Sequence, residues 1–308
     1  SQRFHEFEYS EFFALFLFML SSFQVMVSTD NIILMFIALE AASLALYTII
    51  AMHNRDRSIE AAIKYFTMGA LAAGFFAFGG ALFYLATGSV ELEKSFFALE
   101  SMGTKNFEVL LISLAFMMGA IGFKLSMVPL HTWTPDVYEG ASAPLAGYMS
   151  IVPKIAAFVI AIRIFEFLVA SDLEWVKTML WIAAVATMTI GNILALVQES
   201  VKRMLAFSSI SHAGFGLVAI LVATNEANTA LFMYWTLFMF ANLGAFTMLW
   251  ISRHKSKIFH NRFDHPYTKF SGMVHIAPIP AVIMAIFMLS LAGVPPFALF
   301  WGKFYLIS

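Results

Sequence analysis

The sequence predicts an all-α fold, a polytopic transmembrane bundle of about nine helices. Of its 308 residues, 61% are hydrophobic and only 12% are charged, about half the charged fraction of an ordinary soluble domain. Long apolar runs recur along the chain without the two-residue alternation of β-barrel strands. Because a bilayer accepts apolar side chains on the outside of a protein and water does not, these observations favour a membrane protein.

Candidate spans are the apolar runs of about 20 residues that polar or Pro- and Gly-bearing loops separate. They cover approximately residues 11–27, 31–52, 61–86, 107–130, 144–168, 175–197, 204–223, 228–251 and 278–307. The first ten residues lack the basic start and cleavage site of a signal peptide. The chain begins without methionine and ends inside an apolar run, so we expect a fragment of a longer protein.

Lysine and arginine residues divide unevenly between the two sets of loops that nine passes create. Cytoplasmic loops of membrane proteins are enriched in these residues. One face has only Lys94, Lys105 and Lys177, whereas the other has Arg3, Arg55, Arg57, Lys202, Arg203, Arg253, Lys255, Lys257, Arg262 and Lys269. We therefore predict that the second face is cytoplasmic and that the chain begins on that side.

The nine segments also suggest an internal repeat. Residues 1–170 would form a five-helix unit, and residues 171–308 a second unit that is truncated after its fourth helix. Because five passes are an odd number, the second unit would run upside down relative to the first. The fourth helix of each unit combines lysine with proline: Lys124 and Pro129 in one, Pro295, Pro296 and Lys303 in the other. Inverted repeats with two broken helices are typical of transporters.

The chain contains no cysteine and has a net charge of −1. The lack of cysteine excludes disulfides, thiolate zinc sites, cysteine-ligated iron–sulfur clusters and cysteine nucleophiles. His254, His260 and His265 lie in a basic loop without metal-ligand spacing, and we expect them to be solvated. The sequence therefore predicts neither a metal site nor redox chemistry in this chain.

Four charged residues lie well inside apolar segments: Glu40, Lys124, Lys154 and Lys303. On insertion scales each costs about 2.5–3.5 kcal/mol at a helix centre, and the four together cost about 10 kcal/mol, which rivals the stability of a typical domain. Three lysines face one carboxylate, so direct pairing neutralises at most one of them. A structural interpretation remains open, in which each lysine pairs with a carboxylate or carbonyl and locks two helices together.

The second interpretation is a proton relay. Ionisable groups that share an apolar interior influence one another's protonation, so movement of one charge changes the state of the next. Lysines without a counter-charge also need water around them, and water joins such groups into a path. The surplus of buried lysines favours this interpretation.

Several further polar residues have weaker signals. Lys64 either makes an ordinary helix-surface pair with Glu60, four residues earlier, or is an auxiliary member of the proton relay. Arg163, with Glu166 three residues on, is expected to reach the outer interface in a structural role. His212 lies in the polar stripe 208–212 and either continues a water path or makes an interhelical hydrogen bond.

His131 follows the first predicted break. We expect it to mark the cytoplasmic exit of the broken helix or to have a structural role there.

The longest distinctive motif is GFKLSMVPLHTWTPDVYEGASAP at residues 122–144. Supporting stretches are FIALE at 36–40, QESVKRMLAFSSISH at 198–212, and LAGVPPF at 291–297 with Lys303 beyond it. With these motifs the sequence closely resembles, over essentially its whole length, the subunit N family of bacterial NADH-quinone oxidoreductase, or complex I. That family is similar to cation/proton antiporter subunits.

The resemblance implies fourteen antiporter-like helices in the whole subunit, of which this chain would hold the fourth to the twelfth. It also implies a role for each matching residue. Glu40 and Lys124 would form a coupled pair, Lys154 a central relay, Lys303 the outlet to the periplasm, and Lys64 an auxiliary group. The chain would move protons while quinone reduction takes place elsewhere in the complex.

The same resemblance implies that FMN, iron–sulfur clusters and quinone are bound by partner subunits and that this chain holds no cofactor. Expected partners are the other membrane-arm subunits, including sister antiporter-like subunits, and lipid, but not nucleic acid. The location would be the cell inner membrane. The residue types at Tyr138 and Lys303 resemble those of subunit N and not those of its sister subunits. Ala298 and Leu299 depart from the family, which more often has Ala-Gly after the double proline.

Two other functions use the same residues. The chain could belong to a multisubunit Na⁺/H⁺ antiporter or a membrane-bound hydrogenase, which would use the same buried groups. It could also be a non-transporting spacer whose lysines only hold helices together.

Overall fold

A computed structural model of the chain describes residues 9–98, 104–170, 174–251 and 264–307. These residues are mainly helical. The helices are α1 (Ser10–Ser28), α2 (Ile32–Ala51), α3 (Asp56–Thr87), α4 (Leu92–Ala98), α5 (Thr104–Leu125), α6 (Trp133–Gly140), α7 (Ala143–Met149), α8 (Val152–Ala170), α9 (Glu174–Leu196), α10 (Val201–Val222), α11 (Asn225–Ile251), the 3-10 turn η3 (Tyr267–Lys269), α12 (Met273–Ile276), α13 (Pro278–Ala292) and α14 (Ala298–Ile307).

The prediction of a polytopic helical membrane protein is confirmed. Among the described residues, eight helical spans are long and apolar enough to cross a membrane, and one of them joins α7 and α8. The ninth predicted run, 278–307, is divided into the shorter apolar helices α13 and α14. The interruption between α7 and α8 at residues 150–151 was not predicted.

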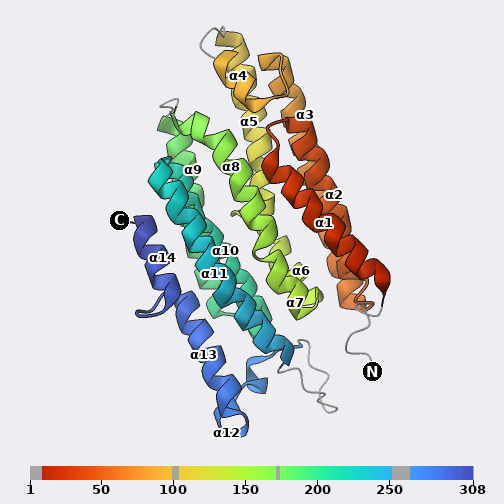
Figure 1. The fold of residues 1–308 in the computed structure, drawn as a ribbon, viewed down its shortest axis with the longest axis vertical. Coiled ribbons are helices and arrows are strands. Elements are labelled where there is room, and N and C mark those ends of the chain that lie inside the picture. Colours follow the sequence, from red (N-terminus) through yellow and green to blue (C-terminus); the bar gives the residue numbers. More distant parts are fainter. Residues whose placement is uncertain (1–8, 99–103, 171–173, 252–263, 308) are drawn as a thin grey trace.

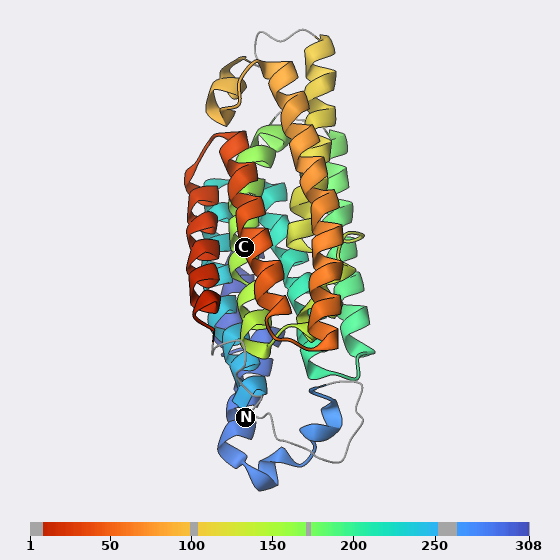
Figure 2. The same ribbon diagram turned by 90° about the vertical axis from the view of Figure 1, so that its right-hand side faces the viewer.

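The long helices lie roughly parallel to one axis of the molecule (Figures 1 and 2). We call α1 to α8 the first unit and α9 to α14 the second unit. Helices α3 and α5 pack together in the first unit, and α9 and α10 in the second. Between the units, α6, α7 and α8 contact α10 and α11. The expected unit boundary at 170/171 borders residues 171–173, which lie outside the described ranges.

The first break in a helix lies between α5 and α6. Ser126 has a φ of 62°, and Pro129 has no N–H with which to continue the helical ladder. The last carbonyls of α5 therefore need other partners. Trp133 Nε1 donates to the Phe123 carbonyl at 3.0 Å, and Thr134 Oγ1 donates to Ser126 Oγ at 2.7 Å. The break is thus held by polar contacts from α6.

The second break lies between α13 and α14. Helix α13 ends at Gly293, whose φ of 79° is the left-handed conformation that glycine adopts most easily. Figure 1 shows α13 and α14 running towards the end of the bundle that holds α4, whereas α5 and α6 run away from it. The two broken helices are therefore antiparallel, as an inverted repeat requires.

Basic residues of the described loops separate between the two ends of the bundle. Arg55, Arg57 and Lys269 lie at the end with α6 and α12, and Lys94 lies on α4 at the opposite end (Figure 1). We call the former the basic end. Arg3, Arg253, Lys255, Lys257, Arg262, His254 and His260 lie outside the described residues.

Two residues of the basic end are buried, and for one of them, His265, this contradicts the sequence-based expectation. Lys202 is 2% exposed and donates to the carbonyls of Glu139, at 3.0 Å, and Ala141. His265 is also 2% exposed and not solvated. Its carbonyl accepts from the backbone N–H of Val201 at 2.9 Å, and the Tyr267 N–H donates to the Glu199 carbonyl at 3.2 Å. The segment 264–269 therefore covers the start of α10, which local polarity does not reveal.

The burial of His265 predicts an acid-sensitive contact. Burial and the charges of Lys202 and Lys269 lower its pKa from 6.5 to about 3. Below about pH 6.5 the released segment binds a proton that the docked segment does not, so docking weakens by about 1.4 kcal/mol per pH unit. We expect hydrogen-exchange protection of the Tyr267 amide to fall between pH 7 and pH 5. The variant His265→Gln should lose this pH dependence, and equal pH dependence in both proteins would contradict the explanation.

Candidate functional site

Lys124 lies in the last turn of α5, immediately before the first break. Its side chain is 8% exposed, and Nζ donates to Ser43 Oγ on α2 at 2.6 Å. The ammonium also lies 5.4 Å from the centre of the Tyr65 ring, which is within the range of a cation–π contact. A cavity of about 10 Å³ beside it is lined by Ser43, Tyr65 and Pro153, among others, and has room for about one water molecule.

Glu40 lies one helical turn before Ser43 on α2 and is half-buried. One carboxylate oxygen, Oε1, is buried without a hydrogen-bond partner. Within the described residues, no basic nitrogen lies within the 4.0 Å that defines an ion pair with Glu40. The Lys124 ammonium therefore bonds to Ser43 and not directly to Glu40, although both charged groups lie in the same region of the bundle.

Lys154 is the most deeply buried of the lysines named from the sequence, at 1% exposure. It lies on α8, and its Nζ donates to the Ser209 carbonyl at 2.8 Å and to Ser209 Oγ at 2.7 Å. Ser209 belongs to α10, so this contact joins the first unit to the second. Both partners are neutral, and hydrogen bonds to neutral oxygens only partly repay the desolvation of an ammonium.

His212 lies one turn after Ser209 on α10 and is 7% exposed. Its Nδ1 forms a hydrogen bond with the hydroxyl of Tyr234 on α11. The interhelical hydrogen bond considered from the sequence is therefore present. His212 also lines a cavity of about 770 Å³, together with Ser208, Ser211 and Lys303, so both interpretations of this residue remain compatible with the structure.

Lys303 lies on α14, beyond the second break, and is half-buried. Its Nζ lies 3.2 Å from the Ala292 carbonyl oxygen and 3.4 Å from that of Leu291. These carbonyls end α13 and have no helical N–H to accept. Lys303 thus satisfies the end of one half-helix from the other and faces the same cavity as His212.

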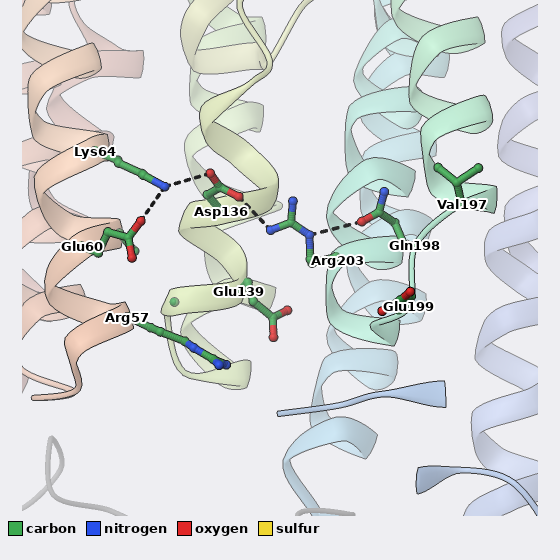
Figure 3. Close-up of a pocket in the computed structure, with 11 residues that line it drawn as sticks. Arg57, Glu60, Lys64, Asp136, Glu139, Val197, Gln198, Glu199 and Arg203 are labelled. Carbon is green, nitrogen blue, oxygen red and sulfur yellow. Dashed lines mark hydrogen bonds and ion pairs between the residues drawn. The ribbon is translucent and has the colours of Figure 1, made fainter. Parts of the chain in front are cut away.

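Lys64 makes more than the helix-surface pair that its spacing with Glu60 suggests. Its Nζ lies 2.7 Å from Glu60 Oε1 and 3.1 Å from Asp136 Oδ2 on α6. The other Asp136 oxygen accepts from Arg203 Nη1 on α10 at 2.7 Å. Figure 3 shows these side chains bridging three helices. Burial raises the pKa of Asp136, but the hydrogen bonds and charges of Arg203 and Lys64 outweigh it and hold the pKa below its usual value.

Sequence reasoning missed Asp136, Glu139 and Arg203. A signal was available, because two carboxylates three residues apart follow a predicted break, but nothing local indicates which cations they meet.

His131 is half-buried in the turn before α6, and its Nδ1 has no partner among the described residues. Arg163 has a structural contact, to Asp30 at 3.1 Å and the Thr29 carbonyl at 2.7 Å.

Among the described residues, the three lysines predicted from the sequence, Lys124, Lys154 and Lys303, are thus buried or half-buried in apolar helices, and each is bonded to neutral oxygens. Within the same residues, no group of three His, Cys, Asp or Glu side chains could hold a metal ion. A lysine with only neutral partners can release its proton and accept it again without breaking an ion pair. Such ammonium groups can therefore take part in proton transfer.

Residues 29–308 match the family described as NADH:quinone oxidoreductase/Mrp antiporter, transmembrane. The chain belongs to this family. NADH-quinone oxidoreductase subunit N of Sulfurimonas denitrificans is 64% identical over 307 residues, which make up 100% of this chain and 61% of that protein. The chain therefore spans about three fifths of the length of such relatives.

Solved structures support the antiporter-like architecture. A chain of respiratory complex I from Thermus thermophilus with bound aureothin has a TM-score of 0.79 and 34% sequence identity, covering 96% of this chain and 62% of its own length. A chain of the membrane-bound sulfane sulfur reductase, an archaeal respiratory membrane complex, has a TM-score of 0.85 at 24% identity, over 95% and 58% of the two chains. The latter likeness concerns the fold alone.

Proposed function

We propose that this family member is a proton-translocating membrane subunit of an NADH-quinone oxidoreductase. The observation that carries the proposal is the placement of Lys124, Lys154 and Lys303, each bonded to neutral oxygens and not to a carboxylate. A helix-locking lysine would be expected to have a counter-charge, because an uncompensated buried ammonium costs several kcal/mol. Groups retained at such a cost in a membrane are usually functional.

The proposed path crosses both units. Glu40 and Lys124 accept and hold a proton in the first unit, with Ser43 between them. Lys154 receives it at the interface of the two units, where Ser209 and His212 share one side of α10. Lys303, which lines a cavity together with His212, then passes the proton on towards the opposite end of the bundle. Water links these groups, because the side chains do not form a continuous hydrogen-bonded chain by themselves.

The wider setting is part of the proposal. The basic end would face the cytoplasm, since cytoplasmic loops are rich in lysine and arginine, and the chain would lie in a bacterial inner membrane. Neighbouring subunits, including sister antiporter-like subunits, would bind FMN, iron–sulfur clusters and quinone, and their redox chemistry would drive transport. The subunit N names of the relatives at 64% and 60% identity support this setting.

A multisubunit Na⁺/H⁺ antiporter is the second candidate, because the matching family also includes Mrp antiporters. The subunit composition of the native complex separates the two. A copurifying peripheral arm with flavin and iron–sulfur clusters supports the oxidoreductase, and its absence supports the antiporter.

A test of transport uses Lys124→Ala and Glu40→Ala in the full complex, reconstituted in vesicles. We expect the complex to assemble in both cases while NADH-driven proton pumping falls by about tenfold or more, as for loss of a proton-transfer group. Lys94→Ala is the matched control, because the Lys94 side chain is 73% exposed on α4 and pairs with Glu91 at the surface. Normal pumping together with failed assembly would instead support a structural spacer.

A further inference from the structure

A second polar cavity lies at the basic end of the bundle. It measures about 480 Å³ and is lined by charged side chains of α3, α6 and α10, and by the residues that lead into α10. Figure 3 shows the carboxylates of Glu60, Asp136, Glu139 and Glu199 around this space. Helix α6 lines this cavity and begins directly after the break next to Lys124. The cavity therefore lies on the side of the proposed path that faces the basic end.

The two carboxylates that α6 contributes have different surroundings. Asp136 gives one oxygen to Lys64 and the other to Arg203, at 3.1 and 2.7 Å. Two cations stabilise its ionised form, which is why the pKa of Asp136 lies below its usual value. A carboxylate held in this way ties helices together and is a poor proton acceptor.

Glu139 has no such clamp. Its side chain is 8% exposed, Oε2 accepts from Ser200 Oγ at 3.1 Å, and Oε1 is buried without a hydrogen-bond partner. Within the described residues, no basic nitrogen forms an ion pair with it. Glu139 lines the polar cavity, and a buried carboxylate oxygen without a protein partner can be satisfied by a proton or by an internal water molecule.

Glu139 is also connected to the inner groups. Ser200, its hydrogen-bond partner, is the residue before α10, the helix whose Ser209 binds Lys154. The rise from Ser200 to Ser209 is about 14 Å along the helix. Beside Glu139, Tyr138 is fully buried, and its hydroxyl lies close to the Ser209 side chain without forming a hydrogen bond of normal geometry. Buried polar atoms of this kind are where water molecules bind inside proteins, so a short water path fits this distance.

We propose that Glu139 takes up the protons that enter from the basic end, before they reach Lys154. The carboxylate accepts a proton from a hydronium ion in the cavity and leaves water behind. The neutral carboxyl then gives that proton to the internal water path and returns to its ionised form. This inference rests on the proposed function and adds to it the end of the bundle at which protons enter and the residue that binds them first.

Pumping by the full complex in vesicles tests the inference. We expect Glu139→Gln to assemble and to pump about tenfold more slowly, because the amide keeps the Ser200 contact but binds no proton. Glu139→Asp should recover much of the rate. Glu174→Gln is the control, since Glu174 is an exposed carboxylate on α9, at the opposite end of the bundle. The complex with this variant should pump normally.

The pH dependence separates intake from a structural role. Acidifying the medium at the basic end, from about pH 8 to pH 6, supplies hydronium directly, so Glu139→Gln should recover relative to the unsubstituted complex. A constant ratio of the two rates would overturn the proposal. Normal pumping by Glu139→Gln while Lys124→Ala is defective would overturn this inference alone, whereas normal pumping by both variants would overturn the proposed function as well.

Discussion

The variant Lys154→Met is expected to abolish most proton pumping while leaving the complex as stable as before, or more stable. Lys154 is 1% exposed, and its ammonium donates to the carbonyl and hydroxyl of Ser209. Methionine fills a similar volume without a charge to desolvate, and replacing buried charges by apolar groups is often neutral or stabilising by about 1–4 kcal/mol. Pumping should fall at least about tenfold, because the relay loses its central acceptor.

Two measurements on the same preparation decide this case: NADH-driven acidification of vesicles, and thermal unfolding of the purified complex. Opposite movements of activity and stability are typical of a functional residue that is held at a cost. Lys94→Met should leave both quantities unchanged, since Lys94 is largely exposed. A marked fall in melting temperature for Lys154→Met would show instead that the lysine holds α8 and α10 together.

The variant Gly191→Val is expected to separate α9 from α10 and to destabilise the subunit. A Cβ atom at Gly191 would lie 2.9 Å from the Ser211 backbone nitrogen and 3.2 Å from the Phe207 carbonyl oxygen. Both are backbone atoms of α10, so no side chain can rotate away. Gly214 faces α9 with a similar approach, 2.8 Å from the Met188 nitrogen. Glycine permits such close helix contacts in membranes, and overpacking them costs about 1–3 kcal/mol or more.

Gly74→Val is the matched control, because a Cβ added to Gly74, in the middle of α3, would meet no described atom within 4 Å apart from its own stretch of helix. The same residue change there should alter stability by less than about 0.5 kcal/mol. Thermal unfolding and the yield of assembled complex report both variants. Equal stability of Gly191→Val and Gly74→Val would mean that α9 and α10 can move apart without loss.

Much of the fold could be predicted from the sequence, because transfer of a segment into a bilayer depends on its own composition and length. The described spans begin and end within a few residues of most predicted runs, and the proline-bearing breaks after Lys124 and before Lys303 are present. The interruption before Lys154 was missed, since residues 150–151 contain neither the break signal of proline nor that of glycine.

The candidate site was predicted in part. Lys124, Lys154 and Lys303 stand out by charge alone, and among the residues that the structure describes none of the three forms an ion pair. Their partners did not follow from sequence, because Ser43 lies 81 residues from Lys124, and Ser209 lies 55 residues from Lys154. The same holds for the clamp on Asp136, whose cations come from α3 and α10.

The sequence by itself determined that this chain is a bundle of apolar helices with a few costly charges at known places. Hydrophobic transfer is nearly additive along a segment, so local composition is enough for that conclusion. Only the tertiary structure decided that Lys124 bonds to Ser43, that His265 is buried, and that Glu139 lines a cavity. Side-chain partners depend on which distant helices pack together, and packing brings residues into contact that no local pattern relates.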